Sequence, residues 1–137
     1  MDSNKVLKIA LMAVSLGGLI SIFYIFNPSQ HSFFFPCPFK LITGYHCPGC
    51  GSQRAIHQLL HGDIVSAFQF NPLMVLTLPI LIYGLGITAW NFINSTQYRV
   101  KLFYNSFFIY GYFGLVAIYW VFRNIPYSPF NWLAPAV

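Results

Sequence analysis

Charged residues are scarce in this sequence of 137 amino acids. They make up 7% of the chain, whereas soluble domains carry about 25%. The chain has no glutamate, and its two acids are Asp2 and Asp63. So few charges cannot cover a water-soluble surface, and catalysis by a pair of neighbouring carboxylates is excluded as well. The lysines and arginines form no basic stripe, so no nucleic-acid partner is predicted.

Hydrophobic residues, in contrast, make up 57% of the chain and are concentrated in three long segments. Residues 6–26, 73–93 and 102–122 are each long enough to cross a bilayer, since about 20 helical residues match a hydrocarbon core of about 30 Å. The first segment is interpreted as a retained helix, because it is longer than the apolar part of a signal peptide. The sequence therefore predicts an all-α membrane protein, a single domain over residues 1–137 with three transmembrane helices in the lipid bilayer.

Basic residues near the ends of these segments indicate the orientation. Four of them would lie on one side of the membrane: Lys5, Lys8, Arg99 and Lys101. Three would lie on the other side: Lys40, Arg54 and Arg123. The positive-inside rule then favours a cytoplasmic N-terminus. The basic side chains are interpreted as anchors that hold helix ends at anionic headgroups.

The connection over residues 27–72 is expected to lie at the membrane surface. Its first part, residues 31–39, is aromatic and interrupted by prolines, which favours an irregular interfacial loop. Two short helices are predicted after it, over residues 53–61 and 64–70. Both contain exposed apolar positions, so we expect this pair of helices to lie in the interface.

Capping residues mark the ends of these helices. Ser52 and Asp63 are the expected N-caps, and Gly62 is the expected stop between the two helices. Asn71, which is followed by proline, has the pattern that begins a helix, here the second transmembrane helix. The tail over residues 123–137 is rich in proline and is expected to fold back against the loop that contains the cysteines.

Two of the three cysteines and three of the four histidines of the chain are clustered within residues 46–63 of this loop. The segment Cys47-Pro-Gly-Cys-Gly51 places two cysteines three positions apart, a spacing with which zinc proteins hold one metal ion. Gly49 lies in the turn between the thiols. Gly51 follows the second thiol, where glycine tolerates the positive φ that such a turn needs. One pair of thiols supplies half of a tetrahedral site, so two further ligands are required.

The missing ligands are predicted to be Cys37, the remaining thiol, and His57 on the first short helix. With Cys47 and Cys50 they would form a closed Cys₃His site, which is typical of structural zinc. Zinc contributes about 10–16 kcal/mol to the folding of small peptides, enough to order an irregular loop. Two alternatives stay open for the thiols, a disulfide or redox pair and unreactive side chains. The alternative for His57 is a helix-surface histidine bonded to backbone or headgroups.

Two charged residues of the loop need partners. The guanidinium of Arg54 lies near apolar helices, so it requires a carboxylate, a phosphate or a carbonyl group. Asp63 is expected to cap its helix, and an Arg54–Asp63 ion pair is the alternative. We assign structural or interaction roles to five residues of the loop: Gly49, Gly51, Arg54, Asp63 and Asn71.

The motifs between residues 35 and 75 resemble a known family. The matching stretches are Phe35-Pro-Cys-Pro-Phe39, Thr43-Gly44, Cys47-Pro-Gly-Cys-Gly-Ser-Gln-Arg-Ala55, Leu59-Leu60, Gly62-Asp63, Ala67 and Asn71-Pro-Leu73. This spacing resembles the family catalogued as domain of unknown function 2752, which comprises small bacterial multi-pass membrane proteins. The resemblance implies a protein of the bacterial inner membrane with a cysteine-centred core, and it implies no particular reaction. Gln53 stands where the family pattern has a small polar residue.

Three functions fit these residues. The favoured one is a non-catalytic membrane component whose loop, cross-linked by zinc or a disulfide, docks a membrane or envelope protein or a second copy of the chain. The second is a membrane thiol–disulfide oxidoreductase that uses Cys47 and Cys50, with Cys37 as a resolving thiol. In that function the helix after Cys50 is expected to lower the pKa of its thiol. The third is an oligomeric transporter or channel lined by Arg54, His57, His61 and Asp63.

Overall fold

Three long apolar helices dominate the structure, a computed structural model that describes residues 3–31, 33–128 and 130–134. They are α1 (Ser3–Ile25), α5 (Pro72–Asn94) and α6 (Ser106–Arg123), and each is long and apolar enough to cross a membrane. Within the described residues the remaining elements are helical as well, and no strand is formed. The prediction of an all-α membrane protein with three transmembrane helices is confirmed.

The start of the third long helix differs from the prediction. α6 begins at Ser106 because Asn105 caps it, accepting a hydrogen bond at Oδ1 from the backbone N–H of Phe107 (2.9 Å). The residues before it form a short 3₁₀ helix, η1 (Lys101–Tyr104). The ring of Phe103 in η1 packs against α5, where a Cβ atom added to Gly84 would lie 2.8 Å from it. The small residue therefore permits this close approach.

Three short helices connect α1 to α5: α2 (Pro38–Thr43), α3 (Ser52–Leu60) and α4 (Ile64–Phe70). α3 and α4 correspond to the two predicted short helices, whereas α2 is absent from the prediction. Pro38 lies in the first turn of α2. Backbone N–H groups in this turn have no partner within the helix, so the lack of an N–H in proline costs no hydrogen bond. Gly44 ends α2 in the left-handed conformation, with φ at 77°.

Most of the expected caps are confirmed. Asp63 caps α4 and Asn71 caps α5, with Oδ1 accepting from Ser66 and Met74 N–H at 2.9 and 3.0 Å. The prediction for α3 is wrong, because Gly51 precedes the helix and Ser52 is its first residue. The positive φ of Gly51 (83°) turns the chain, and the Ser52 hydroxyl accepts a hydrogen bond from the buried Asn71 instead.

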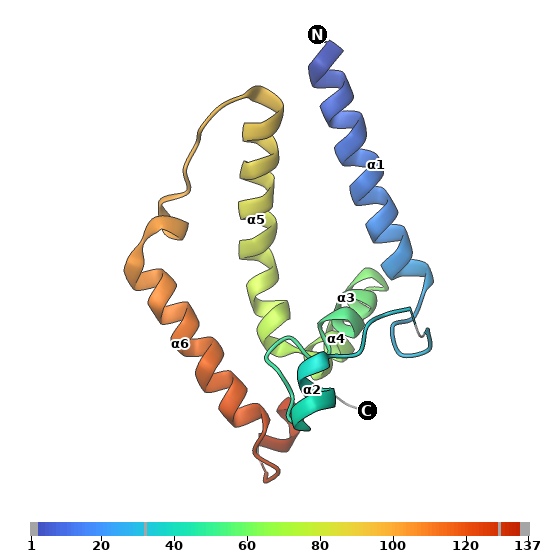
Figure 1. Cartoon of the computed structure of the whole chain (residues 1–137), viewed down its shortest axis with the longest axis vertical. Helices are drawn as coiled ribbons and strands as arrows, with labels where there is room; N and C mark the ends of the chain where they lie inside the picture. Colours follow the sequence, from blue (N-terminus) through green and yellow to red (C-terminus); the bar gives the residue numbers. More distant parts are fainter. Residues whose placement is uncertain (1–2, 32, 129, 135–137) are drawn as a thin grey trace.

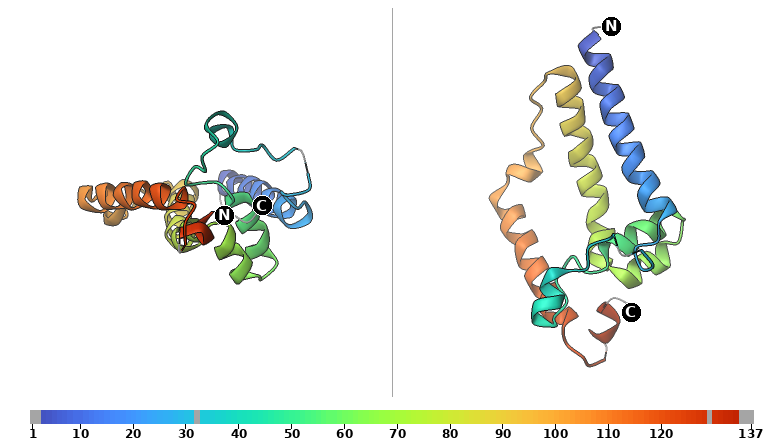
Figure 2. Two further views of the ribbon diagram at one scale, coloured as in Figure 1. Left: turned by 90° about the horizontal axis from the view of Figure 1, so that it is seen from below. Right: turned by 45° about the vertical axis from the view of Figure 1, so that its right-hand side comes forward.

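The short helices lie at one end of the molecule, beside the ends of α1 and α5 (Figure 1). The start of α1 and the link from α5 to η1 lie at the opposite end, as both side views show (Figures 1 and 2). α6 leans away from α5, and an apolar cavity of about 230 Å³ lies between them. Thr77, Phe103 and Tyr112 are among the residues that line this cavity.

The long helices expose apolar side chains over most of their surface. α1 contains no buried residue, and α5 buries only Pro72. Such surfaces are consistent with contact to lipid. Lys8 of α1 joins the two helices at the end remote from the short helices, because its Nζ donates to the carbonyl oxygen of Phe92 in the last turn of α5 (3.1 Å). A cation is favourable at that position of a helix.

Candidate metal centre

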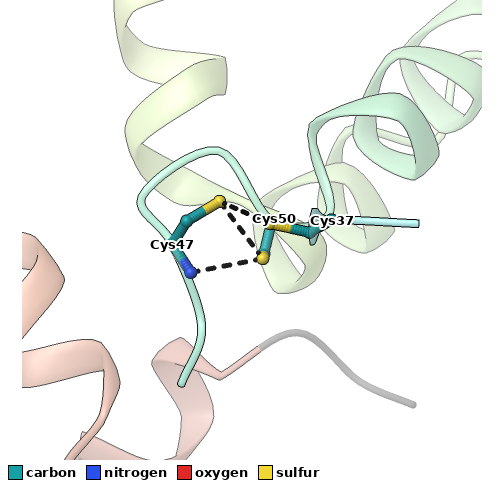
Figure 3. A group of neighbouring side chains, drawn as sticks. All are labelled: Cys37, Cys47 and Cys50. Carbon is teal, nitrogen blue, oxygen red and sulfur yellow. Dashed lines mark hydrogen bonds between the residues drawn. The ribbon is translucent and has the colours of Figure 1, made fainter. Parts of the chain in front are cut away.

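Three sulfur atoms lie close together, two from the turn of residues 47–50 and one from Cys37 before α2. The Sγ atom of Cys47 lies 3.2 Å from that of Cys37 and 3.3 Å from that of Cys50, and all three are within 4.8 Å of one another (Figure 3). A disulfide would need about 2.05 Å, and the three thiols are free. A tetrahedral zinc ion with Zn–S bonds of about 2.3 Å separates its sulfur ligands by about 3.8 Å, so a small opening of this group would admit one ion.

The backbone explains why these sulfurs converge. Cys47 and Cys50 stand at the two ends of a tight turn, in which Cys50 N–H donates to the Cys47 carbonyl oxygen (3.1 Å) and Cys47 N–H points at the Cys50 sulfur (3.3 Å). Gly51 follows with the predicted positive φ. Cys37 approaches from the other side, at the residue before α2. A Cβ at Gly49 would lie 3.9 Å from the Cys47 sulfur, an ordinary contact, so this position does not depend on glycine for space.

The thiols differ in acidity. Burial disfavours the thiolate of Cys37, but hydrogen bonds from the backbone of Lys40 and Phe39 and from the other two thiols outweigh it and lower its pKa to about 7. Burial and hydrogen bonds with Cys47 and Cys37 raise the pKa of Cys50 to about 12. The expectation that the following helix lowers the pKa of Cys50 is therefore wrong, because desolvation dominates at this position.

The structure places His57 outside this group of thiols. Its Nδ1 lies 2.7 Å from the carbonyl oxygen of Phe23 in the last turn of α1. Because a carbonyl oxygen only accepts, Nδ1 carries the hydrogen and satisfies one of the carbonyls that a helix end leaves unpaired. We therefore remove His57 from the proposed ligands. His57 is instead a helix-surface histidine bonded to backbone, which is the alternative given above. His61 is bonded to backbone as well, because its Nδ1 lies 2.8 Å from the His57 carbonyl oxygen.

The charged residues of the loop also have local contacts. Asp63 is exposed, and its carboxylate accepts hydrogen bonds from the backbone and the hydroxyl of Ser66, which lower its pKa. Capping is thus the role that the structure gives it. The guanidinium of Arg54 lies 5.8 Å from the ring centroid of Phe70. A cation over an aromatic face is a favourable arrangement at an interface.

Asn71 supports the cysteine turn while it caps α5. Its side chain is 1% exposed, and its Nδ2 lies 3.0 Å from the carbonyl oxygen of Pro48 and 3.3 Å from that of Cys50. Its Oδ1 accepts hydrogen bonds from Met74 N–H and from the Tyr119 hydroxyl. Asn71 therefore fixes the turn relative to both α5 and α6.

Arg123 and Asn124, at the end of α6, are the residues that sequence analysis missed. Arg123 is 1% exposed and donates to the carbonyl oxygens of Pro48, Cys50 and Phe70 at 3.1, 2.6 and 3.0 Å. Its interpretation as a headgroup anchor is therefore wrong. The sequence signal for them was an arginine followed by an asparagine at the end of an apolar helix. This pattern fits a buried contact and a headgroup contact equally well.

The tail approaches the cysteine loop. A cavity of about 390 Å³ is lined by the turn over residues 44–46 on one side and by residues 123–126 with Ala134 on the other. The 3₁₀ helix η2 (Phe130–Leu133) stacks the ring of Phe130 on Phe122 with centroids 4.8 Å apart. Residues 135–137, the end of the predicted proline-rich tail, lie outside the described residues.

Comparison with known proteins identifies a similar family. Residues 37–85 match the family described as "Protein of unknown function (DUF2752)". No curated protein and no solved structure matches the chain. The matched segment contains the three thiols, α2, α3, α4 and the first part of α5. This match supports the family resemblance over residues 37–85.

Proposed function

We propose that this chain is a non-catalytic protein of the bacterial inner membrane in which Cys37, Cys47 and Cys50 hold one structural zinc ion. The observation that carries the proposal is the convergence of three thiol sulfurs within 4.8 Å. Thiolates suit a soft or borderline divalent ion, and a set of three leaves one position of a tetrahedron for a further ligand. The ion would contribute the bonds that hold α2 against the turn of residues 47–50.

Several contacts support a structural role for this centre. The turn between Cys47 and Cys50 also receives hydrogen bonds from Asn71 at the start of α5 and from Arg123 at the end of α6. One ion would therefore fix the point at which two transmembrane helices and the loop meet. Carboxylates that could act as a catalytic acid and base are scarce, since the chain has no glutamate and two aspartates.

The function of the ordered loop would be to dock a membrane or envelope protein. Support comes from the exposed apolar side chains around α2: Phe35, Leu41 and Ile42 are 87, 71 and 84% exposed. Leu41 and Ile42 lie within α2, between Cys37 at its start and Gly44 at its end, and Phe35 lies two residues before Cys37. With the N-terminus in the cytoplasm, as the basic residues favour, this surface would face the periplasmic side of the membrane.

The test is elemental analysis of the purified full-length protein together with a count of free thiols on the same sample. We expect about one zinc per chain and three thiols that resist alkylation until a chelator is added. Protein without a thiophilic metal, whose thiols react at once, would contradict the proposal.

A thiol–disulfide oxidoreductase is the second candidate, and one observation favours it. The pKa of Cys37 is lowered to about 7, and its sulfur lies 3.2 Å from that of Cys47. The reversible disulfide would therefore form between Cys37 and Cys47, and not between Cys47 and Cys50 as expected from the sequence. In this case the purified protein would lose two thiols on mild oxidation and recover them on reduction, with metal absent in both states.

A further inference from the structure

Arg123 is a buried cation whose hydrogen-bond partners are neutral. Its guanidinium donates to the carbonyl oxygens of Pro48, Cys50 and Phe70 and lies 5.3 Å from the ring centroid of Tyr119. These carbonyl groups accept hydrogen bonds from Nη1 and Nη2, whereas the buried Nε has no hydrogen-bond partner within the described residues, and none of these groups carries a net negative charge. A buried charge that lacks an opposite charge is costly, because it has lost the stabilisation that water provides.

No carboxylate in the described part of the chain offsets this charge. Asp63 is the one acidic side chain there, and it is exposed and bonded to Ser66. Two of its three carbonyl acceptors belong to the turn that holds Cys47 and Cys50, so thiols able to carry negative charge lie beside it. The other ionisable neighbour is Tyr119, and a phenol is neutral near pH 7.

We propose that Arg123 is the counter-charge of an anionic metal–thiolate centre formed by Cys37, Cys47 and Cys50. This inference rests on the proposed metal site, and it adds that the metal together with its thiolates carries a net negative charge. Three thiolates and one divalent ion carry a net charge of −1, and the guanidinium brings the buried group to zero. A metal-free centre with three protonated thiols leaves the cation uncompensated.

The position of Arg123 gives this charge balance a mechanical consequence. Arg123 is the last residue of α6, a helix that leans away from α5 over an apolar cavity (Figure 1). Its contacts with the turn of residues 48–50 are among the few that hold α6 to the rest of the molecule. Metal binding should therefore hold the end of α6 on the cysteine turn, and by linkage a correctly seated α6 should raise the affinity for the metal.

The test measures zinc affinity of the full chain in detergent micelles by competition with a chromophoric chelator. Arg123→Gln should weaken zinc binding by about 10–100-fold, the range for residues that support metal ligands. Arg123→Lys, which keeps the charge and loses the planar fork, should stay within about tenfold of the unaltered protein. The matched control is Lys40→Gln, which removes an exposed charge near Cys37 and should change affinity by less than about threefold because solvent screens it.

Hydrogen exchange provides a second readout. Zinc should slow amide exchange in the last turn of α6 in the unaltered protein and in Arg123→Lys, and should have little effect there in Arg123→Gln. If Arg123→Gln does not fold, the zinc affinity of Arg123→Lys is the deciding measurement. An affinity of Arg123→Lys much more than tenfold below that of the unaltered protein overturns the counter-charge role, because the geometry of the guanidinium would then matter and not its charge. Unchanged affinity in Arg123→Gln overturns only this inference, whereas unaltered protein that binds no zinc overturns the metal site as well.

Discussion

The side chain of Asn124 is hydrogen-bonded to both backbone groups of His46. Its Oδ1 accepts a hydrogen bond from the His46 N–H (2.8 Å), and its Nδ2 donates to the His46 carbonyl oxygen (2.9 Å). The two residues are 78 positions apart in the sequence, so this contact joins the end of α6 to the residue before Cys47. Arg123 bonds to the carbonyl oxygens of Pro48 and Cys50 in the same turn, and the two residues together fix the cysteine turn against α6.

Replacing Asn124 should therefore loosen this junction. Asn124→Leu leaves a backbone N–H and a carbonyl group of His46 without partners, which should lower the free energy of unfolding by about 1–3 kcal/mol. Denaturant titration in micelles measures it. The matched control is Asn94→Leu, because the Asn94 side chain bonds only within α5, to the Trp90 carbonyl oxygen. Equal losses in the two variants would show that the His46 contact contributes nothing.

The three cysteines should behave as one unit. In zinc-loaded protein, Cys37→Ser, Cys47→Ser and Cys50→Ser should each remove most of the stabilisation that zinc provides, and the triple variant should be little worse than any single one. The reason is that loss of one thiolate from a set of three opens the site. Thermal unfolding with and without chelator measures the zinc-dependent part. Additive losses would count against a shared ion.

Alkylation of metal-free protein should depend on pH in a residue-specific way. The thiolate is the nucleophile, so the rate at Cys37 should rise as pH passes about 7, while buried Cys50 should stay slow up to about pH 12. Peptide mapping by mass spectrometry after a short pulse of iodoacetamide distinguishes the two sites. Zinc should protect both. Faster reaction at Cys50 than at Cys37 would mean that the acidities are assigned the wrong way round.

The same two thiols should make metal-free stability depend on pH. A lowered pKa contributes stability that is complete above the ordinary value of 9.0 and is lost as pH falls through about 7. The raised pKa of Cys50 contributes stability that is lost as pH rises from 9.0 to about 12. Their joint contribution should therefore be largest near pH 9, which urea unfolding of the metal-free protein at several pH values can check. A steady decline from pH 7 to 9 in Cys-dependent stability would contradict this sign.

Gly84 should be intolerant of a side chain. A Cβ at this position would lie 2.8 Å from the Phe103 ring, whereas a Cβ at Gly86 meets nothing within 4 Å. Both substitutions to alanine gain similar helix propensity, so the difference between them isolates the contact with η1. We expect Gly84→Ala to be less stable than Gly86→Ala by about 1–3 kcal/mol, the usual cost of overpacking. Equal stability would mean that Phe103 moves away freely.

The membrane fold could be predicted from the sequence because its signals are local. Long apolar segments, the caps Asp63 and Asn71 and the stop at Gly62 each depend on a few neighbouring residues, and the structure confirms them. α2 could not be predicted in the same way. Its sequence is short and begins with proline, so no periodic pattern marks it, and it is fixed from outside by the contact between Cys37 and Cys47.

The candidate site was predictable in part. Cys47 and Cys50 follow from their spacing, and Cys37 from being the remaining thiol. His57 lies on the short helix predicted for it, but the direction of its side chain depends on where α1 ends. There the Phe23 carbonyl oxygen accepts a hydrogen bond from the His57 ring. Arg123 comes from the far end of the chain, so its approach to the turn required knowledge of how α6 is placed. Long-range polar contacts of this kind leave no periodic trace in a sequence.

X-ray absorption at the zinc edge of the purified full-length protein tests the central claim most directly. The account predicts zinc with three sulfur neighbours at about 2.3 Å and one lighter neighbour, and a reduced sulfur count in Cys37→Ser. Zinc surrounded by nitrogen and oxygen alone, or the same spectrum in Cys37→Ser as in the unaltered protein, would contradict a centre built from Cys37, Cys47 and Cys50.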